Sequence, residues 1–195
     1  MPYVTAKLLP KWFMKTYSDN TAFHPEASRL TDAEMNALFN SRPIPCVDIL
    51  VINKKTQQVY LPTRSAKSAS GLWFIGGMLT RDLEPQDAAV KILLRETGLT
   101  IDSSRLSLLA VNRFVWDKGG NNDIDKGRVD INFCFTLDAS QDEIDFMTSD
   151  LDESEYDRRT GFTAFTRPEL ENAIKHESPA KQVLLDYYDL VFSEN

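Results

Sequence analysis

The stretch GLWFIGGMLTRDLEPQDAAVKILLRETGL, residues 71–99, decides the fold of this chain. Its aromatic and β-branched run, Trp73 to Ile75, predicts a strand, and the pair Gly76-Gly77 predicts a loop that brings bare backbone close to a ligand. Residues 85–97 are expected to form a helix that ends at Gly98, because glycine suits a left-handed C-cap. The segment therefore predicts a strand, a glycine loop and a helix in succession.

The same segment resembles the Nudix box, whose pattern is G-x5-E-x7-R-E-U-x-E-E-x-G-U, with U an aliphatic residue. Gly77, Glu96, Gly98 and Leu99 agree with that pattern. Four others depart from it: Lys91 in place of Arg, Glu84 one place beyond the first Glu, and Ile92 and Arg95 in place of two acids. The chain is thus similar to the Nudix family, with a degenerate box. The alternative is a plain α/β unit in which Glu96 is a solvated residue of the last helical turn.

The lost acids decide how many metal ions the predicted helix can hold. Residues four apart share one helix face, so a Glu at position 92 would lie one turn from Glu96. With Ile92 apolar and Arg95 cationic, the helix offers one hard oxygen ligand. A cluster of two or three divalent ions is therefore disfavoured, and we expect a single Mg²⁺ or Mn²⁺.

The composition is that of one globular domain with an extension. The chain has 195 residues, of which 42% are hydrophobic, and a formal charge of −7, which suits a single core. Phosphate is repelled by an acidic surface that lacks basic clusters, so neither nucleic acid nor a membrane surface is an expected partner. We expect neither a secretory leader nor a transmembrane span, because no uninterrupted apolar run of the required kind is found.

The two cysteines bear on the cellular compartment. Cys46 and Cys134 lie far apart in separate apolar runs, which favours buried free thiols over a disulfide or a metal pair. Such thiols fit a reducing environment, so we expect a cytoplasmic protein.

The rest of the sequence predicts further strands and helices. Strands are expected at 46–53, 57–63, 106–116, 128–137 and 162–165. Helices are expected after the capping box at Thr31, after Thr166 and from about Pro179. The Gly- and Asn-rich residues 117–127 predict an exposed hairpin loop that is either a substrate lid or a long turn. The aromatic-rich residues 1–29 are expected to form an arm that packs on the body or on a partner, with a disordered tail as the alternative.

This order of elements resembles the Nudix fold over roughly residues 44–192. The resemblance implies an α+β fold, an α/β/α sandwich in which a mixed sheet lies between helices. We accordingly divide the chain into an N-terminal extension with a short helix, residues 1–43, and a Nudix domain, residues 44–195.

Within the family, the sequence is most similar to the GDP-mannose mannosyl hydrolase branch, whose box also keeps only the last Glu. That similarity lies in three stretches: I-P-x-x-D-x-x-V at 44–51, Arg64 and Lys67 before G-L-W-F, and KHESPAKQVLLDYYDL with His176. The branch implies a Mg²⁺-dependent enzyme in which water attacks the anomeric carbon of a nucleotide sugar and the metal stabilises the leaving diphosphate. It also implies a homodimer.

The resemblance further implies a set of metal ligands. The single ion would be held by the Gly77 carbonyl, by Glu96 and by a side chain of residues 152–157, for which we take Glu153. An ungapped alignment puts Ser154 at the position of the family's loop ligand. The alternative for this acidic loop is a solvated surface.

The Gln-His pair that supplies ligand and base in the relatives is not evident here. The ungapped alignment puts Glu155 at the position of the base, and a carboxylate can act as general base if desolvation raises its pKa. His176 is a second catalytic candidate, with a surface or capping role as its alternative.

Phosphate groups of a nucleotide need cations. Five basic residues are candidates for binding them: Arg64, Lys67, Lys91, Arg95 and Arg113. Relatives keep an Arg just after the paired glycines, where Met78 or Leu79 stands here, which puts GDP-mannose itself in question. Three aromatic residues can stack on a base or sugar or pack in the core: Trp73, Phe114 and Trp116.

Three functions are compatible with these features. The first is a Mg²⁺-dependent hydrolase of a nucleoside diphosphate linked to a sugar or similar group. The second is a catalytically inactive Nudix-fold module that binds a nucleotide or a protein, in which Arg95 pairs with Glu96 or with a phosphate in the metal's place. The third is a Nudix pyrophosphatase that takes further metal ligands from Glu84 and the acidic loop. A small-molecule nucleotide is the expected partner.

Overall fold

The computed structural model describes residues 26–65, 71–116 and 127–192. The predictions for Lys67, for the loop at 117–126 and for the arm up to residue 25 lie outside the described residues. The described helices are α1 (Asp32–Ser41), α2 (Pro85–Thr97), α3 (Gln141–Ser149), α4 (Arg167–Ile174) and α5 (Gln182–Phe192), with short 3-10 turns η2 (Ser103–Arg105) and η3 (Pro179–Lys181). The strands are β1 (Ile44–Asn53), β2 (Gln58–Arg64), β3 (Gly71–Leu72), β4 (Ile75–Met78), β5 (Leu106–Trp116), β6 (Arg128–Asp138) and β7 (Phe162–Phe165).

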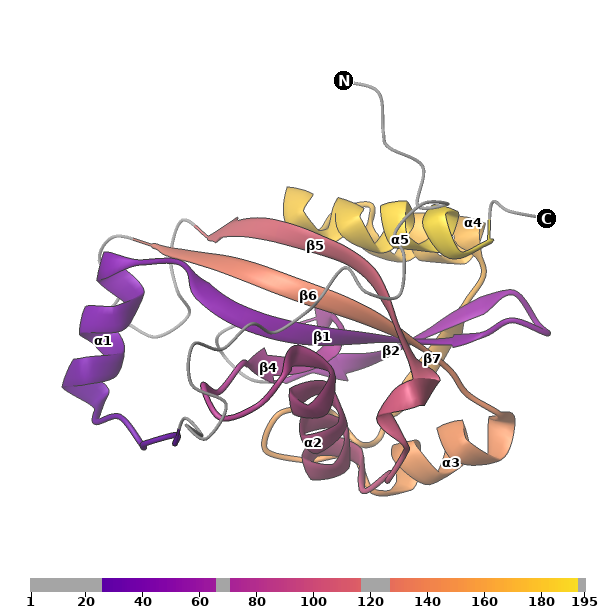
Figure 1. Ribbon diagram of the computed structural model, residues 1–195. Helices are drawn as coiled ribbons and strands as arrows, with labels where there is room; N and C mark the ends of the chain where they lie inside the picture. Colours follow the sequence, from indigo (N-terminus) through magenta and orange to yellow (C-terminus); the bar gives the residue numbers. More distant parts are fainter. Residues whose placement is uncertain (1–25, 66–70, 117–126, 193–195) are drawn as a thin grey trace.

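The strands form one mixed sheet, as expected. Its order is β3-β2-β1-β6-β5, with β4 paired to β1 and β7 paired to β2. β1 and β6 are parallel, whereas the β1–β2, β1–β4 and β5–β6 pairs are antiparallel. Helices α2 and α3 lie on one face of the sheet, and α4 and α5 lie on the other (Figure 1). The predicted sandwich of a sheet between helices is confirmed.

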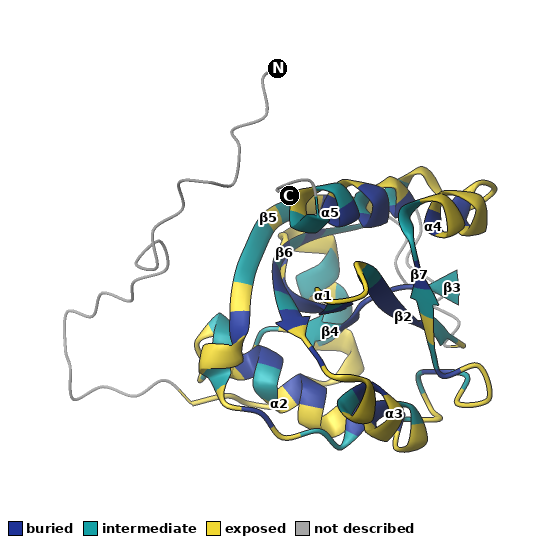
Figure 2. Ribbon diagram, turned by 90° about the vertical axis from the view of Figure 1, so that its right-hand side faces the viewer, coloured by how far each residue is buried: buried dark blue, intermediate teal, exposed yellow. Residues whose placement is uncertain are grey.

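β1 is the centre of the molecule because both of its faces are buried. Val47, Ile49 and Val51 belong to the core beneath α2 and α3, and Leu50 and Ile52 belong to the core beneath α4 and α5. Figure 2 shows the buried residues concentrated on the central strands and on the inner sides of the helices. The near-continuous apolar run of β1 thus reflects a strand with a core on each side.

The predicted box helix is confirmed, but the prediction of a glycine loop before it is wrong. α2 runs over Pro85–Thr97 and is capped by Gly98, whose φ of 67° is the expected left-handed conformation. Gly76 and Gly77 do not form a loop. They lie inside β4, opposite Asp48 and Val47 of β1. The predicted strand at Trp73 to Ile75 is displaced accordingly, because the strand runs over Ile75–Met78 and the two aromatic residues before it are packed in the core.

The other predicted elements are found close to the expected residues. The predicted strands match β1, β2, β5, β6 and β7, and the caps at Thr31 and Thr166 begin α1 and α4. Helix α3 has no counterpart in the sequence analysis, although a capping box of Ser140 and Glu143 begins it. Cys46 and Cys134 are free and buried, as predicted.

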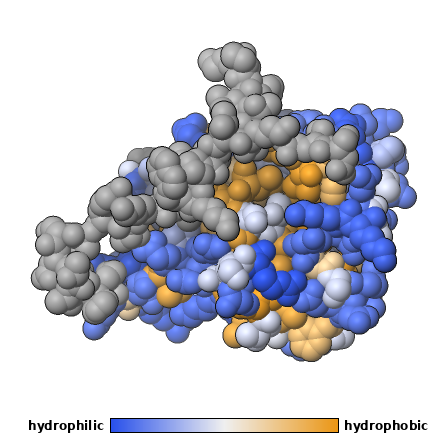
Figure 3. Space-filling model, turned by 45° about the vertical axis from the view of Figure 1, so that its right-hand side comes forward, coloured by the Kyte–Doolittle hydropathy of each residue, from blue (hydrophilic) through white to orange (hydrophobic). Residues whose placement is uncertain are grey.

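No helix in the described part of the chain has the length and apolar character needed to cross a membrane. On the face drawn in Figure 3, hydrophilic residues cover most of the described surface, and apolar residues gather in its upper middle.

Candidate functional site

A cavity of about 390 Å³ opens where β1, β2, β4 and β6 meet the end of α2. Its lining includes eight charged or amide side chains: Asp48, Arg64, Arg95, Glu96, Arg128, Asp130, Asn132 and Glu155. Three aromatic rings also line it: Phe39, Trp73 and Trp116. A cavity of this size with a few convergent polar groups is typical of a site for a small molecule.

Glu96 lies in the last turn of α2, and its side chain is only 2% exposed. Its Oε1 accepts a hydrogen bond from Nη2 of Arg95, and its Oε2 accepts one of 2.6 Å from the hydroxyl of Tyr156. Burial raises the pKa of Glu96, and the bonds from Tyr156 and Arg95 oppose that rise. Both carboxylate oxygens are therefore already engaged by the protein.

The guanidinium of Arg95 reaches from Glu96 towards β4. A Cβ atom built on Gly77 would lie 3.4 Å from Nη2 of Arg95, so the cation stands directly against this glycine. The side chain of Arg95 is also 61% exposed. It therefore presents a positive charge to the cavity at the place where the box resemblance puts a metal ion.

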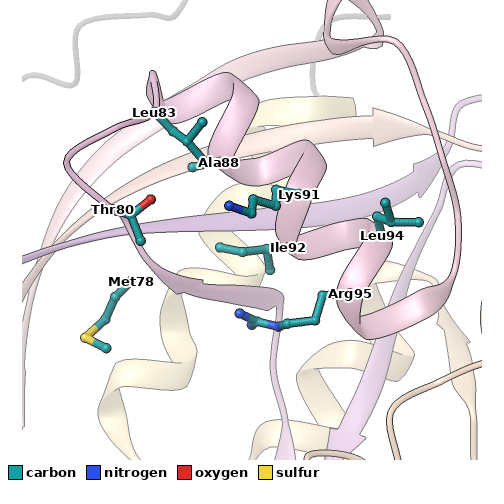
Figure 4. A pocket seen from close by; sticks show the side chains of 8 residues that line it. All are labelled: Met78, Thr80, Leu83, Ala88, Lys91, Ile92, Leu94 and Arg95. Atoms are coloured by element: carbon teal, nitrogen blue, oxygen red, sulfur yellow. The ribbon is translucent and has the colours of Figure 1, made fainter. Parts of the chain in front are cut away.

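A second hollow, of about 320 Å³, lies beside the first over α2. Its eight lining residues, drawn in Figure 4, include no carboxylate: Met78, Thr80, Leu83, Ala88, Lys91, Ile92, Leu94 and Arg95. Positions 92 and 95, where the box pattern has acids, thus contribute an apolar side chain and a cation to this hollow.

The donors present do not fit a divalent ion. Among residues 26–65, 71–116 and 127–192, no group of three or more His, Cys, Asp or Glu side chains could hold a metal. Glu153, the expected loop ligand, is exposed, pairs with Arg158 at 3.1 Å and is not part of the cavity lining. A hard cation prefers several oxygen ligands, whereas the guanidinium of Arg95 lies against Gly77 and already neutralises Glu96.

The acidic loop does reach the cavity through Glu155. Nη2 of Arg64 donates a 2.5 Å hydrogen bond to Oε2 of Glu155, and the guanidinium lies 5.7 Å from the centre of the Tyr156 ring. Two backbone bonds fix the loop, from Ser65 to the Glu155 carbonyl and from Asp152 to the Glu96 carbonyl. The structure therefore brings together four expected site residues, Arg64, Arg95, Glu96 and Glu155, with Gly77.

Three other expected residues lie elsewhere. Lys91 is exposed on α2 and lines the second hollow only. Arg113 is exposed on β5, and His176 is exposed after α4, and neither lines either cavity.

Four polar residues of the cavity were missed by the sequence analysis as site residues: Asp48, Arg128, Asp130 and Asn132. Asp48 interrupts the apolar run of β1, and the other three alternate with Val129 and Ile131 at the start of β6. Polar residues at every second position of a strand share one face. That alternation is the signal that could have found them.

Burial shifts the pKa of Asp48, one of these four residues. Desolvation raises the pKa of Asp48 to about 7, a hydrogen bond from Asn132 lowers it, and the charge of Asp130 raises it. Nδ2 of Asn132 donates to Oδ2 of Asp48 at 2.5 Å. Asp130 accepts bonds from Nε1 of Trp116 at 2.8 Å and from Nη2 of Arg128 at 2.7 Å, both at Oδ2.

Comparison with known proteins shows what the chain is similar to. The NUDIX domain model matches residues 42–186, whereas a comparison with curated proteins finds no match. Among solved structures, the MutT protein of Methanosarcina mazei Go1 is 16% identical with a TM-score of 0.54, covering 80% of this chain and 97% of that one. A MutT NUDIX hydrolase of Burkholderia pseudomallei is 16% identical with a TM-score of 0.51, covering 75% and 98%.

A third structure, a binary complex of the C. elegans Ap4A hydrolase, is 13% identical with a TM-score of 0.51, covering 78% of this chain and 99% of that one. At such identities these structures show the shared fold alone. Enzymes of the family generally use divalent ions such as Mg²⁺, which the donors around Glu96 do not fit. The match to the family model spans most of the sequence and includes α2 and the whole sheet, and the chain therefore belongs to the Nudix hydrolase family.

Proposed function

We propose that the cavity binds a nucleoside diphosphate or a related nucleotide without a divalent ion, and that Arg95 takes the place of the metal. The observation that carries this proposal is the ion pair of Arg95 with Glu96 beside Gly77. The pair satisfies the carboxylate that would otherwise hold the ion. It also leaves an exposed guanidinium in position to neutralise phosphate charge.

The unused donors of the cavity's arginines support an anionic ligand. Three guanidinium groups, those of Arg64, Arg95 and Arg128, line the cavity together with four carboxylates, so the support comes from these donors and not from a net positive charge. Each is paired with one acid, but a guanidinium has five N–H donors, and those not used by the acid can bind phosphate oxygens.

Arg64 supplies the clearest free donor. Its Nε is buried and has no hydrogen-bond partner within the described part of the chain. An unsatisfied buried donor is costly, and a phosphate oxygen would satisfy it. Arg64 lines the same cavity as Arg95, so both cations can act on one ligand.

Calorimetry with ADP and GDP tests the proposal, in buffer with Mg²⁺ and in buffer with EDTA. We expect the same Kd, within about threefold, in both buffers. We also expect Arg95→Ala to weaken binding about tenfold or more, because charge-assisted bonds to phosphate contribute roughly 1.5–3 kcal/mol. Arg113→Ala, which removes an exposed arginine outside the cavity, is the matched control and should bind as wild type. Binding that disappears in EDTA, or that is unchanged in Arg95→Ala, would contradict the proposal.

A second candidate is Mg²⁺-dependent hydrolysis of a nucleotide sugar, as in the GDP-mannose mannosyl hydrolase branch. The observation that favours it is that Gly77, Glu96 and Glu155 line one cavity. A panel of nucleotide sugars with Mg²⁺ tests it. Release of nucleoside diphosphate and free sugar would indicate attack at carbon, whereas nucleoside monophosphate and sugar phosphate would indicate a pyrophosphatase. Turnover at the wild-type rate in Glu96→Gln would exclude a metal role for this carboxylate.

A further inference from the structure

We infer that Asp130 and Asn132 recognise the hydrogen-bond donor edge of a guanine-type base in this cavity. The inference deepens the proposed function and rests on it for the phosphate half of the ligand. It is carried by two buried oxygen acceptors that have no hydrogen-bond partner among the described residues, and by the ring of Trp116, which lines the same cavity.

Asp130 supplies the first acceptor. It is 2% exposed, and its Oδ2 accepts bonds from Arg128 and from Trp116. Its Oδ1 is buried and accepts no hydrogen bond from any described residue. Since a buried carboxylate oxygen left unpaired is costly, this atom is prepared for a donor that the described protein does not supply.

Asn132 supplies the second acceptor, two residues along β6 and therefore on the same face of the strand. Its side chain is buried, with the residue 6% exposed. Its Nδ2 donates to Asp48, which fixes the orientation of the amide and makes Oδ1 the free atom. Oδ1 also has no partner within the described residues. Two residues that line the cavity, two positions apart on one face of β6, therefore each hold a buried oxygen acceptor that no described residue satisfies.

Trp116 is half-buried and offers the ligand that carries these donors a flat ring to stack on, whereas Trp73 is buried and packs edge-on against it. Trp73 and Trp116 both line the cavity, and their ring centres lie 5.7 Å apart at an angle of 70°. The indole N–H of Trp116 is held by Asp130, so the ring and one acceptor are positioned together. Stacking on an aromatic side chain combined with hydrogen bonds to the base edge is a general mode of base recognition.

The chemistry of the acceptors selects among bases. Guanine carries two adjacent donors on one edge, the ring N1–H and the exocyclic amino group. Hypoxanthine keeps the ring N–H but lacks the amino group, and adenine has a ring acceptor at the corresponding position. Two oxygen acceptors therefore favour guanine, leave one oxygen unpaired with hypoxanthine and face an acceptor with adenine.

The test measures binding to the wild-type chain in EDTA for guanosine, inosine and adenosine, and for their 5′-diphosphates. We expect guanosine to bind about tenfold or more tightly than inosine and adenosine, and the same order among the diphosphates. Equal affinity for the three bases, or no binding of any nucleoside, would overturn the inference. Base-selective binding of nucleosides with no gain from the diphosphate would uphold the inference and contradict the proposed phosphate site, so the two failures are distinguishable.

Asn132→Leu tests the assignment to these residues. We expect it to bring the affinity for GDP down to that for IDP, while the affinity for IDP changes less than about threefold. Asn112→Leu is the matched control, since Asn112 lies opposite Asn132 on β5 but does not line the cavity. It should keep the guanine preference. Thermal unfolding checks that Asn132→Leu is folded. A guanine preference that persists in the folded variant would refute the role of this amide. If the variant does not fold, binding of the nucleosides and diphosphates to the wild-type chain still decides the inference.

Discussion

The hydroxyl of Tyr156 donates a 2.6 Å hydrogen bond to Oε2 of Glu96, which lies 60 residues earlier in the chain. Both residues are 2% exposed. The bond ties the loop after α3 to the last turn of α2, and the backbone bond from Asp152 to the Glu96 carbonyl reinforces it. The position that the box pattern assigns to a metal ligand is thus used to join two parts of the fold.

Tyr156→Phe should therefore destabilise the protein. The change leaves a buried carboxylate oxygen without its donor, and the expected loss in the free energy of unfolding is roughly 1.5–3 kcal/mol at neutral pH. The bond from Tyr156 lowers the pKa of Glu96, so its removal raises that pKa further. The loss should be smaller in acid, where Glu96 is protonated in both states. Urea unfolding at two pH values measures it.

Tyr60→Phe is the control for this change. Tyr60 is also buried in the same core, but its hydroxyl contacts two neutral glutamine oxygens at 3.3 and 3.4 Å. Long bonds to neutral groups contribute less, so the loss should stay below about 1 kcal/mol. Equal losses in the two variants would show that the Tyr156 hydroxyl does not stabilise the carboxylate.

Gly76→Ala should destabilise the protein far more than Gly77→Ala, although the two glycines are neighbours in β4. A Cβ on Gly76 would lie 2.2 Å from Oδ1 of Asp48 and 2.6 Å from the Val47 carbonyl oxygen. A Cβ on Gly77 would have no neighbour closer than 3.4 Å. We expect a loss of about 1–3 kcal/mol or more for Gly76→Ala, because backbone must move, and under about 1 kcal/mol for Gly77→Ala.

Thermal unfolding of both variants measures this difference. It also separates the two roles of the glycine pair. If both alanines cost the same, the close approach of Asp48 to β4 is not what requires a glycine at position 76.

This glycine pair shows where reasoning from the sequence failed. The C-cap at Gly98 and the capping boxes at Thr31 and Thr166 are local, since each depends on residues within one helical turn, and their prediction is correct. The need for Gly76 comes from Asp48, a residue on another strand that becomes its neighbour only when β1 and β4 pair. Local patterns contain no information on such a contact, so Gly-Gly was predicted as a loop.

The candidate site likewise contains some residues that a local sequence pattern indicates and others that only the three-dimensional contacts reveal. The box pattern points to Glu96, Gly77 and Arg95 because it places them within one segment, and the ion pair of Arg95 with Glu96 is one of the arrangements expected from the sequence. Asp130 and Asn132 follow no box pattern, and their unpaired oxygens appear only when the contacts of both atoms are known. The metal prediction depended on a loop acid, and the loop presents Glu155 to Arg64 while Glu153 faces solvent.

Asp48 makes stability depend on pH. Its pKa is raised by burial from an ordinary value of 3.8 to about 7, so between those values the folded state binds more protons than the unfolded state. Stability should therefore fall as the pH rises from about 4 to about 7. Asp48→Asn should flatten this slope and stabilise the protein at pH 8 by a few kcal/mol, because the amide oxygen can still accept the bond from Asn132.

Urea unfolding across this pH range is the measurement. Asp145→Asn, which changes an exposed carboxylate on α3, should leave the slope as in the wild type. A slope that is identical in Asp48→Asn and wild type would place the titrating group elsewhere.

Restoring the two lost acids should create a metal site where the wild type has an ion pair. In the double variant Ile92→Glu, Arg95→Glu, two carboxylates join Glu96 on the last turns of α2, and the cation that neutralises Glu96 is removed. Several hard oxygens on one helix end attract a divalent ion, so we expect Mn²⁺ binding, seen as a loss of the free-ion signal in electron paramagnetic resonance. The control Ile92→Gln, Arg95→Gln has nearly the same shape without charge and should bind no Mn²⁺. Strong Mn²⁺ binding by the wild type, or none by the acidic variant in its folded state, would show that Arg95 is not what separates this chain from a metal-binding Nudix helix.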